Sequence, residues 1–158
     1  MRAEIETSFG RYTALISGAG VTRLHFPGAQ HVCINDKASS ARQEKIARKL
    51  AEELQAYHAG DLKRFTVAVD FSGQTAFRQR VWRELQNIPY GNTLTYGEVA
   101  VRISCRSARA VGQACGANPV PLLVPCHRVV AATGMGGFSG GTGLKEKLLA
   151  WERRANTA

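Results

Sequence analysis

The first quarter of the chain alternates apolar and polar residues over short distances. Three runs rich in β-forming residues follow one another, at residues 5–7, 11–17 and 21–26. Glycine-containing turns separate them, and this pattern predicts an antiparallel meander. Val32 and Ile34 would continue the sheet.

The spacing becomes helical after Ser40. Apolar residues recur every three or four positions, at Ile46, Leu50, Leu54 and Tyr57. Ser40 and Gln43 have the spacing of a capping box, and Gly60 ends the pattern. We therefore predict an amphipathic helix that covers the meander.

A boundary between two halves is predicted at residues 72–74. Before it, Val67, Val69 and Phe71 alternate as one more strand or as an extended linker. Ser, Gly and Gln then interrupt the pattern. The expected organisation is an α/β domain over residues 1–72 and a second domain over residues 73–158.

Helical spacing dominates the second half. The first helix has the apolar stripe Phe77, Val81, Leu85 and Ile88, beside which Trp82 is expected in the core. Thr75 is a possible cap, and residues 89–91 close this helix. A last helix is expected from about Gly143 to Arg154, with an apolar face made by Leu144, Leu148 and Trp151.

Two short helices lie between these. Thr95 and Glu98 form a second capping box, and a turn at 104–107 precedes a small-residue helix over 108–117. Two helices joined by a tight turn, the second basic at its start, are typical of a helix-turn-helix. The alternative is that Ala and Gly simply permit tight internal packing.

Length and composition are those of an ordinary globular protein. The 158 residues are 44% hydrophobic and 21% charged, enough for one ordinary domain or two small ones. We find no apolar stretch long enough to cross a bilayer and no signal peptide at Met1. The expected location is the cytoplasm, or the nucleus in a eukaryote, with no membrane partner.

The cysteines are spaced irregularly, which argues against a disulfide framework and for reduced thiols. They are Cys33, Cys105, Cys115 and Cys126. Metal ligands could come from His25, His31, Cys33 and His58. Their spacing matches no tight zinc pattern, so no metal is expected.

Positive charge is concentrated in the second half. Residues 1–75 contain ten Lys and Arg against eight Asp and Glu, whereas residues 76–158 contain eleven against four. This asymmetry favours a polyanionic partner such as DNA, although solvated surfaces are also often basic.

The strongest chemical candidate is Cys126. It follows the apolar run 122–124 and Pro125, so a buried strand should end here and present the thiol at a turn. His127 and Arg128 can favour the thiolate, which is the nucleophilic form. The alternative is a packed thiol beside an ordinary imidazole.

A glycine-rich segment over 133–141 follows the Cys126 region. It can bring backbone groups close to a ligand, or it can be a flexible linker. Because no Gly-Lys-Ser/Thr follows it, a phosphate-binding loop is not indicated.

Three motifs together resemble the O6-alkylguanine-DNA alkyltransferase family. They are Arg109-Ala110-Val111-Gly112, Asn118-Pro119 and Pro125-Cys126-His127-Arg128-Val129. The resemblance is close from about Phe77 to Glu152 and covers the first half only in layout. It implies a ribonuclease H-like first domain, with a small antiparallel sheet plus helix. It also implies irreversible transfer of an alkyl group, typically methyl, from O6 of guanine in DNA to Cys126, with O4 of thymine as a second target.

The resemblance also implies roles for single residues. Glu152, His127 and a bridging water would remove the proton of Cys126, and Asn118 would order the preceding turn. Tyr96 would help to rotate the nucleotide out and protonate the leaving guanine. No cofactor is needed.

Double-stranded DNA would bind through its minor groove to a monomer of the protein. The DNA-contacting residues implied are Arg109, Tyr96, Thr95, Ala110 and Gly112, with Arg109 filling the gap left by the extruded base. The base pocket would be made by Val129, Phe138, Ser139 and Gly140. Phe138 stands where relatives often carry Tyr, and the turn at 104–107 lacks their usual Pro.

Two other classes use some of the same features. A DNA-binding regulator could share the fold without the chemistry, and a Cys-His hydrolase could share the chemistry without being consumed.

Overall fold

The computed structural model describes residues 1–29, 38–138 and 141–157. These residues form two compact units, Met1–Ser72 and Gly73–Ala158. The predicted extension of the first sheet through Val32 and Ile34 lies outside the described residues. Each unit has its own buried residues and is described separately below.

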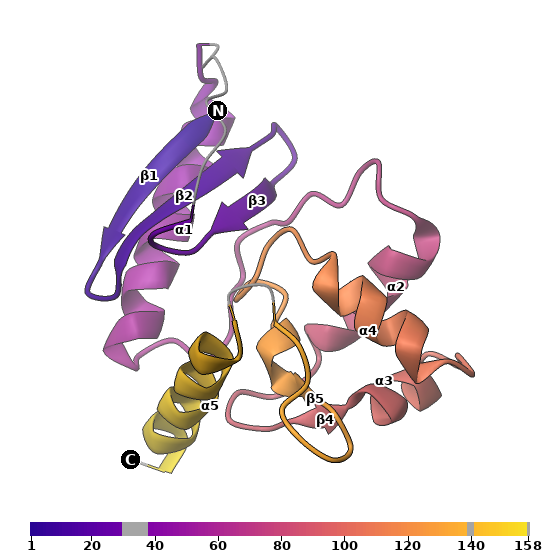
Figure 1. The fold of residues 1–158 in the computed structure, drawn as a ribbon. Helices are drawn as coiled ribbons and strands as arrows, with labels where there is room; N and C mark the ends of the chain where they lie inside the picture. The colour runs from indigo at the N-terminus through magenta and orange to yellow at the C-terminus, as the bar shows by residue number, and fades with distance from the viewer. Residues whose placement is uncertain (30–37, 139–140, 158) are drawn as a thin grey trace. The chain divides into compact units, whose positions relative to one another are not determined.

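The first unit contains the predicted antiparallel meander (Figure 1). Its strands are β1 (Arg2–Thr7), β2 (Gly10–Ile16) and β3 (Val21–His25), in the order β1-β2-β3. Ile5 lies opposite Tyr12, and an irregularity at Leu15/Ile16 shifts the register between β2 and β3. The prediction of three short antiparallel strands is confirmed.

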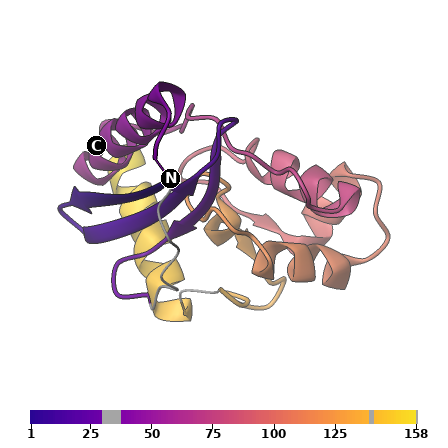
Figure 2. The same cartoon turned by 90° about the horizontal axis from the view of Figure 1, so that it is seen from above.

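Helix α1 (Ala41–Ala59) lies against this sheet, as Figures 1 and 2 show from two directions. The predicted capping box is present, because Ser40 accepts from the Gln43 N–H and Gln43 accepts from the Ser40 N–H. Gly60 ends the helix in the left-handed conformation, with φ 85°. Three side chains on the inner face are almost fully buried: Leu50, Leu54 and Tyr57.

The segment after α1 is extended but is not a regular strand. Glu53 of α1 holds it by accepting from the backbone N–H groups of Thr66 and Val67. Its pairing is an isolated parallel bridge between Val69 and Val21. A side chain at Gly20 would lie 2.6 Å from the Ala68 carbonyl oxygen, so only glycine allows this approach.

The second unit is mainly helical. Its helices are α2 (Ala76–Leu85), α3 (Tyr96–Arg102), α4 (Ala108–Gly116) and α5 (Thr142–Thr157), with a 3₁₀ turn η1 (Cys126–Arg128). Thr75, Thr95 and Ser107 cap the first three through their side chains. Trp82 is fully buried and its Nε1–H donates to the Ala114 carbonyl at 2.8 Å, which joins α2 to α4.

A short parallel pair positions the start of α3. Strands β4 (Leu94–Thr95) and β5 (Val129–Val130) pair Leu94 with Val129 and Thr95 with Val130. Tyr96 is therefore held beside the segment that follows Cys126. The sequence pattern did not predict this pair, because two residues are too few to show a period.

The buried face of α5 differs from the prediction. Leu148 is buried as expected, but Leu144 and Trp151 are only half-buried. The buried residues are Lys145, Leu148, Leu149 and Glu152. The helix turns this face toward η1, so two charged side chains take positions that the apolar pattern had assigned to Leu144 and Trp151.

Candidate active site

The run before Pro125 forms a tight buried turn, so the prediction of a strand ending there is wrong. Leu122 adopts a left-handed conformation with φ 71°, which no strand allows, and Val124 N–H donates back to the Val120 carbonyl. Asn118 holds this turn from inside. Its side-chain amide donates to the Val124 carbonyl at 2.8 Å, and its side-chain oxygen accepts from Val120 N–H at 3.0 Å.

Cys126 begins η1 and is only 5% exposed. Burial raises the pKa of its thiol. The Asn118 side chain, the Lys145 charge and backbone N–H groups oppose this effect and favour the thiolate. A resting thiol in these surroundings needs a base nearby before it becomes a strong nucleophile.

The base is available in the neighbouring residue, His127, which is 1% exposed. Its Nε2 lies 2.6 Å from Glu152 Oε1. Burial lowers the pKa of His127, and the charges of Arg128 and Lys145 lower it further. The hydrogen bond to Glu152 and the charge of Glu152 raise the pKa but do not outweigh these effects. The imidazole is therefore neutral near pH 7.

Glu152 is fully buried and receives two donors from Arg128, from Nε and Nη2, each at 2.9 Å. Burial alone would raise the pKa of Glu152, but the hydrogen bonds from His127 and Arg128, together with the Arg128 charge, outweigh it and lower the pKa to about 2. The carboxylate can only accept, so the His127 proton must lie on Nε2. Glu152 is thus buried and paired, although its place near a helix end would otherwise suggest a solvated position.

The tautomer leaves Nδ1 of His127 as a hydrogen-bond acceptor. This atom is buried and has no hydrogen-bond partner among the described residues. His127 follows Cys126 directly in η1, so the chain supplies an acceptor without a partner in the residue next to a thiol that must lose a proton. Cys126, His127 and Glu152 are therefore the residue types of a nucleophile, a base and a carboxylate that orients the base.

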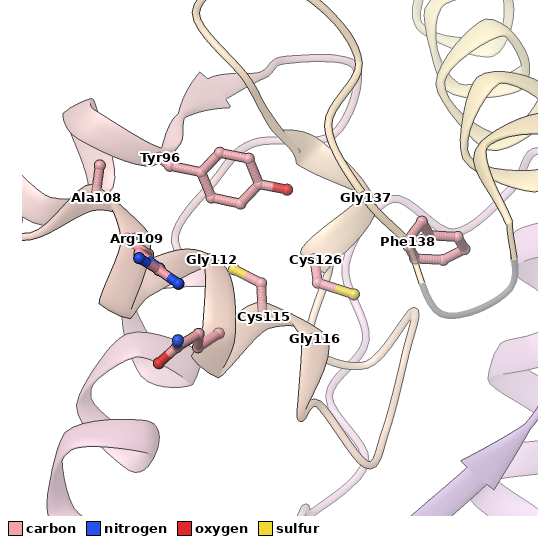
Figure 3. A pocket seen from close by; sticks show the side chains of 10 residues that line it. Tyr96, Ala108, Arg109, Gly112, Cys115, Gly116, Cys126, Gly137 and Phe138 are labelled. Carbon is pink, nitrogen blue, oxygen red and sulfur yellow. The ribbon is translucent and has the colours of Figure 1, made fainter.

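Cys126 opens into a pocket of about 550 Å³, shown in Figure 3. The lining residues are Tyr96, Ala108, Arg109, Gly112, Gln113, Cys115, Gly116, Cys126, Gly137 and Phe138. Most are small or aromatic, and Arg109 supplies a positive charge. Such a lining suits a planar aromatic ligand beside an anionic group.

Tyr96 is held tightly at one wall of this pocket. A Cβ on Gly136 would lie 2.8 Å from the Tyr96 hydroxyl, and one on Gly112 would lie 3.8 Å from its ring. The Lys145 ammonium lies 5.8 Å from the centre of the same ring. Burial, and then the nearby cysteines, raise the pKa of Tyr96, so its hydroxyl keeps a proton to donate.

The remaining predicted site residues lie in different places. Thr95 caps α3, Ala110 is half-buried in α4, and Val129 is buried in β5; none of the three lines the pocket among the described residues. Ser139 and Gly140 lie outside the described residues.

Sequence reasoning missed Lys145, a second buried cation of the site beside Arg128. It is fully buried in α5, and its ammonium donates to the Gly137 carbonyl at 3.1 Å. The signal was present, because residues 145, 148, 149 and 152 have helical spacing and share one face with Glu152. Cys115, named only as one of four thiols, was likewise not expected in the pocket.

The residues that were weighed as possible metal ligands do not form a cluster in the described part of the chain. No group of three or more His, Cys, Asp or Glu side chains suitable for a metal occurs there, and His31 and Cys33 lie outside it. His58 instead bonds to the Tyr12 hydroxyl at 2.9 Å and stacks on Phe9. Across residues 1–29, 38–138 and 141–157, no helix is long and apolar enough to span a bilayer.

Comparison with known proteins agrees with this geometry. The family described as "6-O-methylguanine DNA methyltransferase, DNA binding domain" matches residues 76–154. A methylated-DNA--protein-cysteine methyltransferase of Mycolicibacterium paratuberculosis is 50% identical over 109 residues, which cover 68% of this chain and 66% of that protein. The inducible one of Bacillus subtilis is 42% identical over 137 residues, which cover 85% of this chain and 71% of that protein.

Solved structures agree as well. A crystal structure of Mycobacterium tuberculosis OGT in complex with DNA has a TM-score of 0.78 and 36% identity, covering 96% of this chain and 92% of that one. The resemblance inferred from the three motifs is confirmed. This chain belongs to the 6-O-methylguanine DNA methyltransferase family.

Proposed function

We propose that the protein repairs DNA by moving one alkyl group, typically methyl, from O6 of guanine to the sulfur of its own Cys126. O4-alkylthymine is a second candidate substrate. The observation that carries the proposal is a pocket-facing cysteine backed by a buried base, His127, which Glu152 holds in the required tautomer. The family membership of the chain supports the same reaction.

The first step is loss of the Cys126 proton. His127 Nδ1 accepts it through a bridging water, and Glu152 stabilises the imidazolium that forms. Arg128 keeps Glu152 ionised throughout, because its guanidinium remains charged. Asn118 and Lys145 favour the thiolate until it reacts.

The thiolate then attacks the alkyl carbon in line. The new C–S bond forms as the C–O6 bond breaks, and guanine leaves with the electron pair. Tyr96 donates a proton or hydrogen bond to the departing base, which its raised pKa allows. A thioether has no good leaving group, so each protein molecule reacts once and needs no cofactor.

The target base must leave the helix before this reaction can occur. O6 of a stacked guanine is inaccessible, and extrusion costs a few kcal/mol. Arg109 is exposed at the mouth of the pocket, and we propose that it enters the duplex and fills the gap. Phe138 and the Val129 carbonyl would contact the extruded base.

We propose that α3, the connection and α4 form a helix-turn-helix that binds the minor groove. Two of the exposed residues of α4, Ala108 and Gly116, are small, so its backbone can approach DNA closely at these positions, beside the longer Arg109 and Gln113. Exposed arginines in α2, in α3 and in the connection before α4 suit phosphate contacts. They are Arg78, Arg80, Arg83, Arg102 and Arg106.

We propose that residues 1–72 form a ribonuclease H-like domain and residues 73–158 the DNA-binding, alkyl-accepting domain. The meander, the following helix and the parallel bridge from Val69 to Val21 support the first assignment. All of the reacting groups come from one chain, which supports a monomer. A free reactive thiol requires a reducing compartment such as the cytoplasm.

Stoichiometry tests the proposal. Increasing amounts of duplex DNA carrying O6-methylguanine are mixed with a fixed amount of protein, and restored guanine is counted. We expect restoration to stop at one guanine per protein, while Cys126→Ala binds the same duplex and restores none. Continued turnover would indicate a hydrolase, and binding without restoration would indicate a regulator.

A further inference from the structure

A second thiol lines the pocket beside the alkyl acceptor. Cys115 lies in the last turn of α4 and is 7% exposed. Figure 3 shows its side chain and that of Cys126 in the wall of the same pocket, one from α4 and one from η1. Alkyl transfer as proposed above has no step for Cys115.

The two cysteines belong to one compact cluster. Asn118 N–H donates to the Cys115 carbonyl at 3.2 Å, and the side chain of the same Asn118 lowers the pKa of the Cys126 thiol. Tyr96 and Lys145 are electrostatic neighbours of both cysteines. The two cysteines therefore share three neighbouring residues.

Their surroundings give the thiols different reactivity. Burial, followed by the Cys126 charge, raises the pKa of Cys115 to about 12, so Cys115 remains a thiol. At Cys126, the Asn118 side chain, the Lys145 charge and backbone N–H groups favour the thiolate. An oxidant that enters the pocket should thus react first at Cys126.

We propose that Cys115 and Cys126 form a dithiol site for hydroperoxides, in which Cys115 resolves oxidised Cys126 as a disulfide. The Cys126 thiolate attacks the peroxide oxygen, which gives a sulfenic acid and releases hydroxide. Oxidation removes the Cys126 charge, which is one of the two causes that raise the pKa of Cys115. Cys115 then gives its proton to the sulfenic oxygen as its sulfur attacks the sulfenic sulfur, so the S–S bond forms and water leaves. A dithiol reductant restores both thiols.

The consequence is protection of a protein that can react only once. Without a resolving thiol, further peroxide would carry Cys126 to the irreversible sulfinic acid. With the disulfide, alkyl transfer stops while peroxide is present and returns on reduction. This inference uses the proposed function only for its readout, since disulfide formation can be measured without DNA.

The test exposes the reduced full-length protein to hydrogen peroxide, blocks the remaining thiols and maps peptides by mass spectrometry. Dithiothreitol is then added, and alkyl transfer is measured as a fraction of each variant's own untreated activity. We expect a Cys115–Cys126 linked peptide and recovery of most of the activity in the wild type. Cys115→Ser should recover almost none and should carry sulfinic acid at Cys126.

Cys105→Ser is the matched control, because Cys105 lies in the connection between α3 and α4 and does not line the pocket. It should recover as the wild type does. Equal recovery in Cys115→Ser, or linkage of Cys126 to another cysteine in the wild type, would overturn the inference. If the linked peptide forms but untreated protein never accepts an alkyl group, the proposed function fails and this inference stands.

Discussion

In this site, burial and two or three neighbouring groups determine the protonation state of each titratable side chain. His127 is neutral because it is buried, and Glu152 is ionised because Arg128 and His127 surround it. Burial alone would raise the pKa of Glu152, so this buried carboxylate depends on its partners to stay ionised. The chemistry therefore depends on one contiguous buried network, and removing any charge from it should affect stability and reaction together.

Glu152→Gln tests this network. The amide leaves the buried Arg128 guanidinium without its counter-charge, so the free energy of unfolding should fall by about 3–5 kcal/mol. Loss of the oriented base should slow alkyl transfer by about 10²–10⁴-fold, measured on protein that circular dichroism shows to be folded. Glu146→Gln is the control, because Glu146 is exposed on the same helix. Equal behaviour of the two variants would contradict the assignment.

Gly136→Ala tests the placement of Tyr96. Gly136 has φ +75°, and an added Cβ would lie 2.8 Å from the Tyr96 hydroxyl, so the tyrosine or the loop must move. The strain costs about 1–3 kcal/mol, and transfer from methylated duplex should slow by about tenfold or more. Gly134→Ala meets nothing within 4 Å and should react at the wild-type rate. A normal rate in Gly136→Ala would remove Tyr96 from the reaction.

Sequence reasoning could predict residues that belong to motifs better than residues recruited by packing. Cys126 and His127 stood out as adjacent reactive groups, and family motifs pointed to Asn118 and Glu152. Lys145 was missed because a lysine in an amphipathic helix normally lies on the solvated face. Its helical spacing to Glu152 indicated a shared face, and the fold shows that this face turns Lys145 toward Gly137 and Tyr96.

At the scale of elements, local signals predicted most helices and failed where pairing is non-local. The capping boxes at Ser40 and Thr95 define the starts of α1 and α3. The β4–β5 pair joins residues far apart in the chain, and no local pattern encodes it. The turn before Cys126 looked like a strand because its residues are apolar, but Asn118 bonds close it into a loop.

Arg109 lies at the start of α4, where it can reach the DNA duplex in the proposed complex. Arg109→Ala should slow repair of O6-methylguanine in duplex DNA by one to two orders of magnitude, because extrusion of a base costs a few kcal/mol. Reaction with free O6-methylguanine needs no extrusion and should change little. Arg106→Ala is the comparison: Arg106 is exposed in the connection and does not line the pocket, so loss of this proposed phosphate contact should weaken duplex binding but leave the rate at saturating duplex unchanged. Equal losses on duplex and free base would exclude the proposed role of Arg109.

At the scale of the whole molecule, the two units should respond to acid differently. Burial lowers the pKa of His58, in the first unit, from 6.5 to about 4. When the pKa of a group is lower in the folded protein than in the unfolded protein, the group contributes its full stability at pH values above its unfolded-state pKa. This stability is lost as the pH falls through the folded-state pKa. The first unit should therefore weaken between pH 6.5 and pH 4. The pKa of Glu152 is lowered from 4.5 to about 2, so the second unit should lose folding stability at lower pH, between about 4.5 and 2.

His58→Gln provides the measurement for the first unit. This variant cannot titrate in that range, so its melting temperature should depend less on pH between 6.5 and 4 than that of the wild type. Hydrogen exchange should locate the difference in residues 1–72. An unchanged slope, or a change confined to residues 73–158, would show that His58 does not control the acid response.

The central claim is that one buried sulfur takes up the alkyl group. Mass spectrometry of protein incubated with duplex DNA carrying a labelled O6-methylguanine tests it most directly. We predict that the intact mass rises by one methylene equivalent and no further, with the label on the peptide that contains Cys126. A label on another residue, or an unchanged mass in folded protein that has bound the duplex, would contradict the account.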